Sequence, residues 1–288
     1  MKFETHLIDR DYETVYYFLK DQGFSETYIS SLRKKTGQIL INNQIANTRS
    51  KLQAGDFLML NLSTKRASRF KTNDISLDIV YEDEQYLVVN KPSGLTTSPS
   101  RSHYDENLSG AVLNYMQEKD PDFVVRIINR LDKDTAGLVI IAKDSVSYNK
   151  IGKIEKTYYA ICTGILDKNM TLDYPIETIS NNGINQLRRI VSPLGKAAKT
   201  YVTPIECFNN LSLLEIKLEH GRTHQIRVHL SHIGHPLLGD EVYGEPSTLI
   251  NHTALVCKKV CFIHPKTKEK ITLEANYPED FKALLPSK

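Results

Sequence analysis

The sequence of 288 residues has little that would support disulfide, membrane or metal chemistry. No apolar run of about 18 residues occurs, and the N-terminus lacks the apolar core of a secretory signal. We therefore expect a cytoplasmic protein without a membrane segment. The four cysteines are too sparse for a disulfide scaffold and include no Cys-x-x-Cys pair. Cys257 and Cys261 lie in one apolar run and are predicted to be core thiols on the same face of a strand, rather than metal ligands.

The composition is that of an ordinary globular chain, with 40% hydrophobic and 25% charged residues. The formal net charge of +3 is too small to identify a nucleic-acid-binding protein by itself. The distribution of charge is more informative, because basic residues gather in two clusters near the N-terminus. Taken alone, each cluster is typical of a solvated surface. The clusters are Arg33, Lys34 and Lys35 in the first, and Lys65, Arg66, Arg69 and Lys71 in the second.

The periodicity of apolar residues divides the chain into residues 1–62, a basic linker over 63–75 and a large unit over 76–288. In the first unit, Val15, Phe18 and Leu19 predict one helical face. Ser25 is the expected N-cap of a second helix with Ile29 and Leu32 on its apolar face. The remaining expected elements are an end to that helix at Gly37, a strand at Ile39–Ile41, turns at Asn42–Asn43 and Gly55–Asp56, and a strand at Phe57–Leu62.

The large unit contains many short β-rich runs and few helical patterns, which predicts an α+β domain on a large, mostly antiparallel mixed sheet with flanking helices. Leu108, Val112 and Met116 lie on one face of a helix expected over Asn107–Glu118. No internal repeat occurs. The expected strands are Tyr86–Asn90, Gly137–Lys143, Lys156–Thr163 and Leu211–Leu218.

The segment Arg126–Lys143, RIINRLDKDTAGLVIIAK, places the carboxylate of Asp132 in a polar turn between two apolar runs. The pattern predicts a strand, a turn and a second strand. Gly137 supplies the backbone freedom that such a turn often needs. This turn is the expected place for chemistry.

The residues Arg130–Leu138 of this turn resemble the signature of the Rlu-type pseudouridine synthases, which isomerise uridine inside RNA. Four ordered blocks of the chain resemble motifs of that family, which is far more specific than one short pattern. The other three are Tyr81–Leu95 with its Lys-Pro-x-Gly turn, the Lys156-Thr157-Tyr158 strand, and Gly221–Gly244. Residues 1–62 resemble the S-four-type RNA-binding domain, with a generic α+β capping domain as the alternative.

Two positions of the signature depart from the family pattern. Asn129 stands where many members have His, and Ala136 stands where Ser is usual. Neither is the expected catalytic residue, so they are expected to alter the hydrogen bonds of the turn or an RNA contact without removing the reaction. The segment between Asp132 and Tyr158 is also short, which predicts a trimmed connecting helix around Val146–Lys153.

The resemblance implies a catalytic role for Asp132. Burial alone raises the pKa of a carboxyl group and a paired arginine lowers it, so a buried, ionised Asp132 needs such a partner. The resemblance nominates Arg227, and Arg222 is the alternative. Tyr158 is implied to stack on the target base and to take part in proton removal, whereas Tyr159 is expected on the opposite face of its strand. Whether Asp132 acts on the sugar or on the base stays open.

The remaining implied roles concern RNA binding. Arg130 matches an arginine that fills the space left by the extruded base, with an ion pair to Asp134 as the alternative. Ile226 would provide an apolar wall for the base, and Lys156 is a further substrate-binding candidate. Next to an RNA-enzyme signature, the two basic clusters are better interpreted as phosphate contacts. The implied substrate is structured RNA, ribosomal RNA first and transfer RNA second, for a monomer that needs neither metal nor cofactor.

Three other functions are weighed against this one. The histidines at 220, 224, 229, 232 and 235 could suggest a metallohydrolase, but they lack the glutamate of an HExxH motif. Asp132 and Asp134 could form a glycosidase pair, although their spacing is too short for one. The more serious alternative is a non-catalytic RNA-binding or ribosome-assembly factor that keeps the fold.

Overall fold

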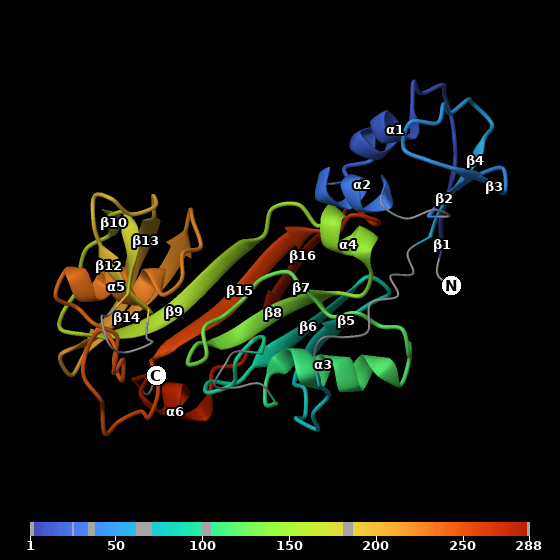
Figure 1. The fold of residues 1–288 in the computed structure, drawn as a ribbon. Coiled ribbons are helices and arrows are strands. Elements are labelled where there is room, and N and C mark those ends of the chain that lie inside the picture. Colours follow the sequence, from blue (N-terminus) through green and yellow to red (C-terminus); the bar gives the residue numbers. More distant parts are fainter. Residues whose placement is uncertain are drawn as a thin grey trace.

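The computed structural model describes residues 3–24, 26–33, 38–61, 71–99, 105–180 and 187–286. These form a small N-terminal unit and a larger unit on one long sheet, which is the α+β architecture predicted from the sequence (Figure 1). Within the described ranges, no helix is long and apolar enough to cross a membrane. Some predicted residues lie outside these ranges: Ser25, Lys34, Lys35, Gly37, Lys65, Arg66 and Arg69.

The N-terminal unit packs two helices on a four-stranded antiparallel sheet of order β1-β4-β2-β3. Val15, Phe18 and Leu19 are buried, as predicted. Asn42 and Asn43 have φ of 50° and 66°, which a two-residue hairpin turn requires. The elements are β1 (Phe3–Leu7), α1 (Val15–Asp21), α2 (Glu26–Arg33), β2 (Ile39–Ile41), β3 (Gln44–Ala46) and β4 (Phe57–Asn61).

The N-terminal unit rests on a short helix of the larger unit, α4 (Ser145–Lys150) (Figure 1). Val146 is buried in the same apolar cluster as the N-terminal helices. The Lys150 ammonium lies 3.2 Å from a Glu4 carboxylate oxygen and 4.5 Å from the centre of the Phe24 ring. This six-residue helix overlaps the segment around Val146–Lys153 in which the sequence predicts a short connecting helix.

The larger unit is built on a ten-stranded mixed sheet. Its main path has the order β10-β13-β14-β9-β15-β8-β6-β5, with β16 beside β15 and β7 beside β8, and only the β15–β8 contact is parallel among the described strands. A separate hairpin, β11 (Ile176–Ser180) and β12 (Leu187–Val191), stands beside one end of the sheet. The sheet strands are β5 (Ile79–Glu82), β6 (Tyr86–Lys91), β7 (Arg126–Ile127), β8 (Ala136–Ala142), β9 (Glu155–Thr163), β10 (Met170–Asp173), β13 (Lys199–Phe208), β14 (Leu211–Leu218), β15 (Leu255–Ile263) and β16 (Lys270–Glu274).

Three helices complete this unit: α3 (Leu108–Gln117), α5 (Gln225–His232) and α6 (Glu279–Ala283). The Asn107 side chain caps α3 by accepting a hydrogen bond from the Gly110 amide at 3.0 Å. Alternate residues of β9 face different apolar clusters, because side chains alternate along a strand. Tyr158 belongs to the cluster that contains the buried side of α3, whereas Tyr159 packs at the cluster around Phe281 of α6. The predicted opposite orientation of the two tyrosines is confirmed.

The predicted common face of Cys257 and Cys261 is wrong. The register between β15 and β9 shifts between Cys257 and Lys259, so one extra residue of β15 enters the strand there. Cys257 pairs with Tyr158 and is fully buried, whereas Cys261 pairs with Glu155 and is half-exposed. A bulge of one residue moves every later side chain to the other face of the sheet, and the amino-acid pattern gives no sign of it.

The parallel contact between β8 and β15 requires glycine at position 137. Gly137 has φ of +113°, and a Cβ atom there would lie 2.3 Å from the Cys257 carbonyl oxygen. Gly137 therefore serves the strand that follows the Asp132 turn, rather than the turn itself. Through this contact the start of β8 lies directly beside Cys257, which pairs with Tyr158.

We expect Gly137→Ala to lower the free energy of unfolding by about 3–5 kcal/mol, because the methyl group meets both an unfavourable φ and the backbone of β15. Gly152→Ala is the matched control, since Gly152 has φ of +68° but open space around it. That change should cost about 1–2 kcal/mol. Urea unfolding of both variants measures the difference, and equal losses would contradict the role given to the close approach.

Candidate active site

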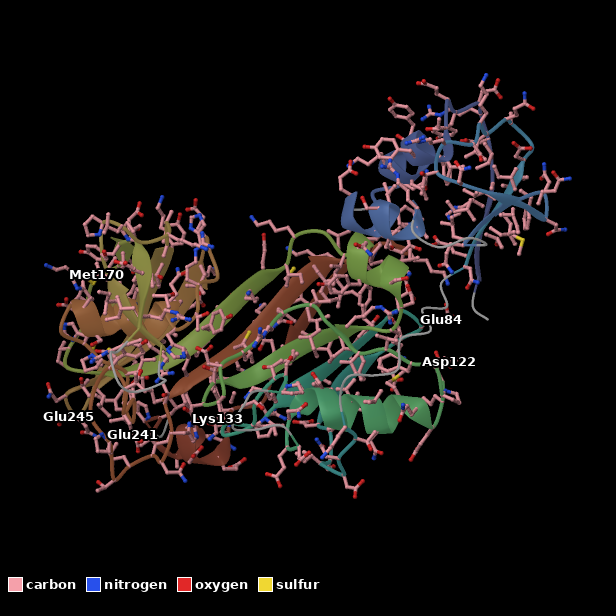
Figure 2. The ribbon with its side chains drawn as sticks, in the orientation of Figure 1. Glu84, Asp122, Lys133, Met170, Glu241 and Glu245 are labelled. Carbon is pink, nitrogen blue, oxygen red and sulfur yellow. The ribbon has the colours of Figure 1, made fainter. Side chains whose placement is uncertain are left out.

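A cavity of about 380 Å³ opens between the Asp132 turn, β9 and the loop that leads into α5. Figure 2 labels Lys133, the residue after Asp132, which lies along the length of the large unit. Glu84 and Asp122 lie toward one end of this unit, and Met170 and Glu245 lie toward the other. The structure brings together the seven candidates that the sequence placed in the large unit over 76–288. The lining includes Arg130, Asp132, Lys156, Tyr158, Arg222, Ile226 and Arg227.

The Asp132 turn is held from one side by Lys91 of the Lys-Pro-x-Gly segment. The Lys91 side chain is fully buried and donates to the carbonyl oxygens of Lys133 at 3.0 Å, Leu95 at 2.7 Å and Pro92 at 2.8 Å. Three acceptors match the three hydrogens of an ammonium group. Burial lowers the pKa of Lys91 to about 7, while the negative charges of Asp134 and Asp132 oppose that shift.

Buried Thr97 holds the residue just before Asp132. Its hydroxyl donates to the Leu131 carbonyl at 2.6 Å, and the Leu131 amide donates to the Thr97 hydroxyl oxygen at 3.2 Å. The turn itself closes by a hydrogen bond of 3.2 Å from the Thr135 amide to the Asp132 carbonyl. The backbone around Asp132 is therefore fixed by side chains from one distant segment of the chain, residues 91–97.

Asn129, one of the two departures from the family pattern, bridges the turn to β8. Its Nδ2 donates to the Leu138 carbonyl at 3.0 Å, and its Oδ1 accepts from the Ile140 amide at 2.8 Å. The side chain is buried and both halves of its amide are paired. An amide supplies a donor and an acceptor at once, so this departure leaves the backbone of β8 satisfied.

The Asp132 carboxylate is less buried than predicted, with 30% of its side chain exposed. His224 Nε2 lies 3.9 Å from Asp132 Oδ2, a contact that becomes an ion pair only when the His224 ring is protonated. Among the described residues neither Arg227 nor Arg222 forms an ion pair with Asp132, so the prediction of a buried carboxylate paired with one of these arginines is wrong.

The Arg227 guanidinium is instead paired with Asp240. Its Nε and Nη2 donate to the two carboxylate oxygens at 2.7 Å each, and both side chains are buried. Burial opposes the charge on Arg227, but Asp240 and then Asp132 raise its pKa above the usual value. Arg227 and Asp132 thus interact through their charges without contact. Arg222 donates its Nε to the Ala197 carbonyl at 3.0 Å.

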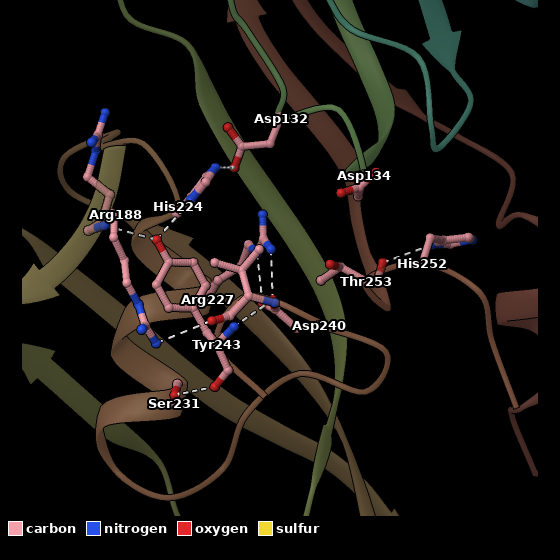
Figure 3. A network of polar contacts seen from close by, with 12 residues as sticks. Asp132, Asp134, Arg188, His224, Arg227, Ser231, Asp240, Tyr243, His252 and Thr253 are labelled. Carbon is pink, nitrogen blue, oxygen red and sulfur yellow. Dashed lines mark hydrogen bonds and ion pairs between the residues drawn. The ribbon is translucent and has the colours of Figure 1, made fainter. Parts of the chain in front are cut away.

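Tyr243 connects this pair to His224 (Figure 3). The Tyr243 hydroxyl lies 2.9 Å from His224 Nδ1, and its ring lies 5.2 Å below the Arg227 guanidinium carbon. His224 has φ of 57°, an uncommon conformation for a residue with a side chain. Burial lowers the pKa of His224 below 6.5, Asp132 opposes that shift, and Arg227 adds to it, so the ring is neutral at pH 7.

Tyr158 lies on the sheet face of the cavity, close to Asp132 and Cys257. Its side chain is buried, and burial raises the pKa of Tyr158 well above its usual value, with Cys257 and Asp132 adding to the shift. The side chain is therefore a neutral phenol at pH 7. Ile226, at the start of α5, is also buried and lines the same cavity. A phenol ring and an isoleucine offer the apolar surfaces that a flat base can stack on.

Arg130 is exposed and lines the cavity, which leaves its guanidinium accessible to RNA. The alternative ion pair with Asp134 does not form between these two described residues. Asp134 is not among the described residues that line the cavity, and in Figure 3 it lies apart from the polar contacts of Asp132. The structure thus gives no support to a glycosidase pair of Asp132 and Asp134.

Three of the five histidines that suggested a metal site, His224, His229 and His235, have hydrogen-bond partners within the protein. His229 is buried. Its Nδ1 lies 2.9 Å from the Thr200 hydroxyl, and its Nε2 lies 2.9 Å from the Tyr174 carbonyl. His235 Nδ1 lies 2.9 Å from the Thr163 carbonyl. Across the described part of the chain, no group of three or more His, Cys, Asp or Glu residues is placed to hold a metal ion.

Several residues of the site were not singled out from the sequence as site residues. The blocks that resemble family motifs include Lys91, Asp240 and Tyr243, so the sequence indicates that these positions belong to motifs. Their roles depend on contacts between distant segments, and no local pattern assigns a partner. Thr97 lies outside these blocks and has no sequence signal of its own.

In the N-terminal unit, Arg33 is the one predicted RNA contact that the described residues include. Its Nε donates to the Thr48 hydroxyl at 3.1 Å, and its guanidinium carbon lies 5.4 Å from the centre of the Tyr16 ring. Lys71, at the end of the second basic cluster, is paired with Asp105 at 2.9 Å. Both side chains are therefore at least partly engaged within the protein.

Comparison with known proteins agrees with this geometry. The chain is 36% identical over 256 residues to the uncharacterized RNA pseudouridine synthase YhcT of Bacillus subtilis, covering 86% of this chain and 84% of that protein. It is 34% identical over 271 residues to the ribosomal large subunit pseudouridine synthase D of Pseudomonas aeruginosa, covering 87% of this chain and 84% of that protein.

Solved structures support the fold at lower identity. Human RNA Pseudouridylate Synthase Domain Containing 4 superposes with a TM-score of 0.57 at 19% identity, over 71% of this chain and 90% of that one. Human RNA Pseudouridylate Synthase Domain Containing 1 superposes with a TM-score of 0.56 at 21% identity, over 72% of this chain and 85% of that one. The sequence model of the RNA pseudouridylate synthase family matches residues 85–232. The chain therefore belongs to the RNA pseudouridylate synthase family and is an RNA pseudouridine synthase, an intramolecular isomerase.

Proposed function

We propose that this enzyme converts specific uridines of structured RNA, with large-subunit ribosomal RNA first and transfer RNA second, by means of the Asp132 carboxylate. The observation that carries the proposal is the position of Asp132 on the wall of an open cavity beside Tyr158 and Arg227. The named relative that modifies the large ribosomal subunit favours ribosomal RNA as the substrate.

The reaction breaks the bond between uracil N1 and ribose C1′ and forms a bond between uracil C5 and C1′. The C5 proton leaves and N1 gains a proton, so no redox partner is required. In our proposal Asp132 assists the breaking of the glycosidic bond, as a nucleophile or as a base. Arg227, anchored by Asp240, acts through its charge on the same region of the cavity.

Tyr158 is assigned two tasks, stacking on the base and taking part in removal of the C5 proton. Because Tyr158 is a neutral phenol, it can accept that proton only while it passes its own on, and Asp132 is the neighbouring carboxylate. Ile226 supports the free base from another wall. Arg130, exposed at the cavity mouth, would occupy the space that the extruded nucleotide leaves.

The N-terminal unit is assigned a role in RNA binding as an S-four-type domain over residues 1–62, joined by a basic linker over 63–75 to the catalytic part. In this assignment Arg33, Lys34 and Lys35 contact phosphate groups, and the linker residues extend that surface. The geometry of the site needs one copy of the chain, so we propose a monomer.

Replacing the carboxylate separates catalysis from binding. We expect Asp132→Asn to reduce uridine conversion by at least about 1,000-fold while RNA affinity stays within a few-fold, because only the reacting group is lost. The matched control is Asp134→Asn, because the Asp134 carboxylate lies two residues away and is not among the described residues that line the cavity. Uridine conversion by this variant should stay within about threefold of wild type. Mapping of pseudouridine in unmodified ribosomal and transfer RNA transcripts measures conversion.

A wild-type protein that binds RNA but converts no uridine in either transcript would favour the non-catalytic alternative. Full conversion by Asp132→Asn would refute the assignment of the carboxylate while leaving the family membership intact.

Lys91 is expected to act as a positioning residue for the Asp132 turn. Lys91→Met leaves three carbonyl groups without their donor, so we expect a loss of about 2–4 kcal/mol in unfolding free energy and at least a tenfold fall in kcat. Lys266→Met is the control, because its ion pair with Glu84 is exposed and should contribute little to stability. A destabilised Lys91→Met variant with unchanged kcat would show that Lys91 does not position the turn.

His224 should set the acid limb of the pH profile. The pKa of His224 lies below 6.5, so the ring is neutral at pH 7 and takes up a proton as the pH falls through that lowered value. The resulting cation lies 3.9 Å from Asp132 and would compete with the substrate for the carboxylate, so kcat/KM should fall. We expect His224→Asn, which tolerates the positive φ, to lose this limb. Identical profiles from pH 5 to 8 would exclude the effect.

A further inference from the structure

A second cavity, of about 500 Å³, adjoins the catalytic one and takes no part in the reaction described above. Its walls are the β11–β12 hairpin, the loop after β12 and residues 221–223. Gly221, Arg222 and Thr223 line both cavities, so the two spaces share a wall. An RNA strand that left the catalytic pocket along this shared wall would enter the second cavity.

The lining of this second cavity carries an excess of positive charge. It contains Arg189, Lys196 and Arg222, against Glu177 as the only acid among its described lining residues. Within the described ranges none of these three basic side chains forms an ion pair with an acidic residue. Nη1 of Arg189 is buried and has no hydrogen-bond partner there. A buried donor without a partner costs free energy, and an anion in the cavity would supply the partner.

Backbone contacts within the protein hold the walls of this cavity in place. Lys196 and Ile176 exchange two backbone hydrogen bonds of 2.9 Å, which fasten the loop to β11. Gly195 makes this contact possible, because a Cβ atom there would lie 2.4 Å from the Ile176 carbonyl carbon. The basic groups are therefore presented on a fixed backbone, which reduces the ordering that a ligand has to impose.

The second cavity is also tied to the catalytic residues. The Arg189 amide donates to the Tyr243 hydroxyl at 3.2 Å, and the same hydroxyl lies 2.9 Å from His224 Nδ1. His224 in turn faces Asp132 at 3.9 Å. One tyrosine thus fixes the distance between the basic cavity and the catalytic carboxylate, as expected for sites that bind neighbouring parts of one substrate.

We propose that the second cavity binds the RNA backbone next to the target uridine, with Arg189, Lys196 and Arg222 as phosphate ligands. The inference rests on the proposed function. A nucleotide extruded into the catalytic pocket carries its flanking phosphodiesters to the rim of that pocket, and guanidinium and ammonium groups are the usual ligands of backbone phosphates. Such contacts position the strand and carry little sequence information, so this site sets register and affinity.

The test compares Arg189→Gln and Lys196→Gln with two matched controls. Arg188→Gln removes the neighbouring arginine of β12, which is not among the residues that line the second cavity. Lys168→Gln removes an exposed lysine that lines neither cavity. The probes are unmodified transcripts of large-subunit ribosomal RNA and of transfer RNA. Affinity is measured by filter binding across a series of KCl concentrations, and conversion is measured under steady state on the RNA that wild type modifies.

We expect each cavity variant to raise Kd and KM by about 5- to 20-fold with kcat within about twofold. The slope of log K against log salt should become shallower by about 0.7 for each lost phosphate contact. Both controls should stay within about twofold of wild type. Lys196→Gln keeps the test valid if Arg189→Gln disturbs folding, because Lys196 is exposed.

Unchanged affinity and salt slope in both cavity variants would overturn the inference while the proposed function stands, provided that wild type converts uridine. A fall in kcat alone would also overturn it, because it would indicate a purely structural role through Tyr243. Absence of any conversion by wild type would reject the proposed function, and the inference with it.

Discussion

The close contact of β8 with β15 at Gly137 is the constraint on which the rest of the catalytic site depends. It is the one parallel pairing among the described strands of the large sheet, and it allows no side chain at position 137. Because Cys257 pairs with Gly137 on one side and with Tyr158 on the other, three strands are locked in one row. The turn that carries Asp132 enters β8 at this row, so its carboxylate is directed to the cavity above Tyr158.

The charges around this row are divided between structure and chemistry. Asp240 accepts two hydrogen bonds from Arg227 in a buried contact, and a buried charge without such a partner would be strongly destabilising. Asp132 keeps no comparable partner and stays half-exposed beside a neutral histidine. The anchored arginine keeps its position before RNA arrives, and the carboxylate stays available. The basic groups of the adjoining cavity extend this arrangement along the proposed path of the RNA strand.

Much of the fold could be predicted because its signals are local. The alternation of apolar residues placed β14 at Leu211–Leu218, and the helical spacing placed α3 within one residue of each end. The predictions failed where a distant partner decides. Phe3–Leu7 has no strong strand pattern and becomes β1 by pairing with β4. The bulge after Cys257 leaves no mark in the sequence, yet it separates two cysteines that a regular strand would place together.

The sequence by itself determined the family, the fold class and which residues meet at the site. The reason is that the residues of the family motifs line one cavity and serve one reaction. Tertiary structure alone decided the pairing: Arg227 binds Asp240, His224 faces Asp132, and Lys91 holds the turn from a distant strand. A charged side chain selects its partner by distance and burial in the folded chain, and neither quantity is present in the order of the residues.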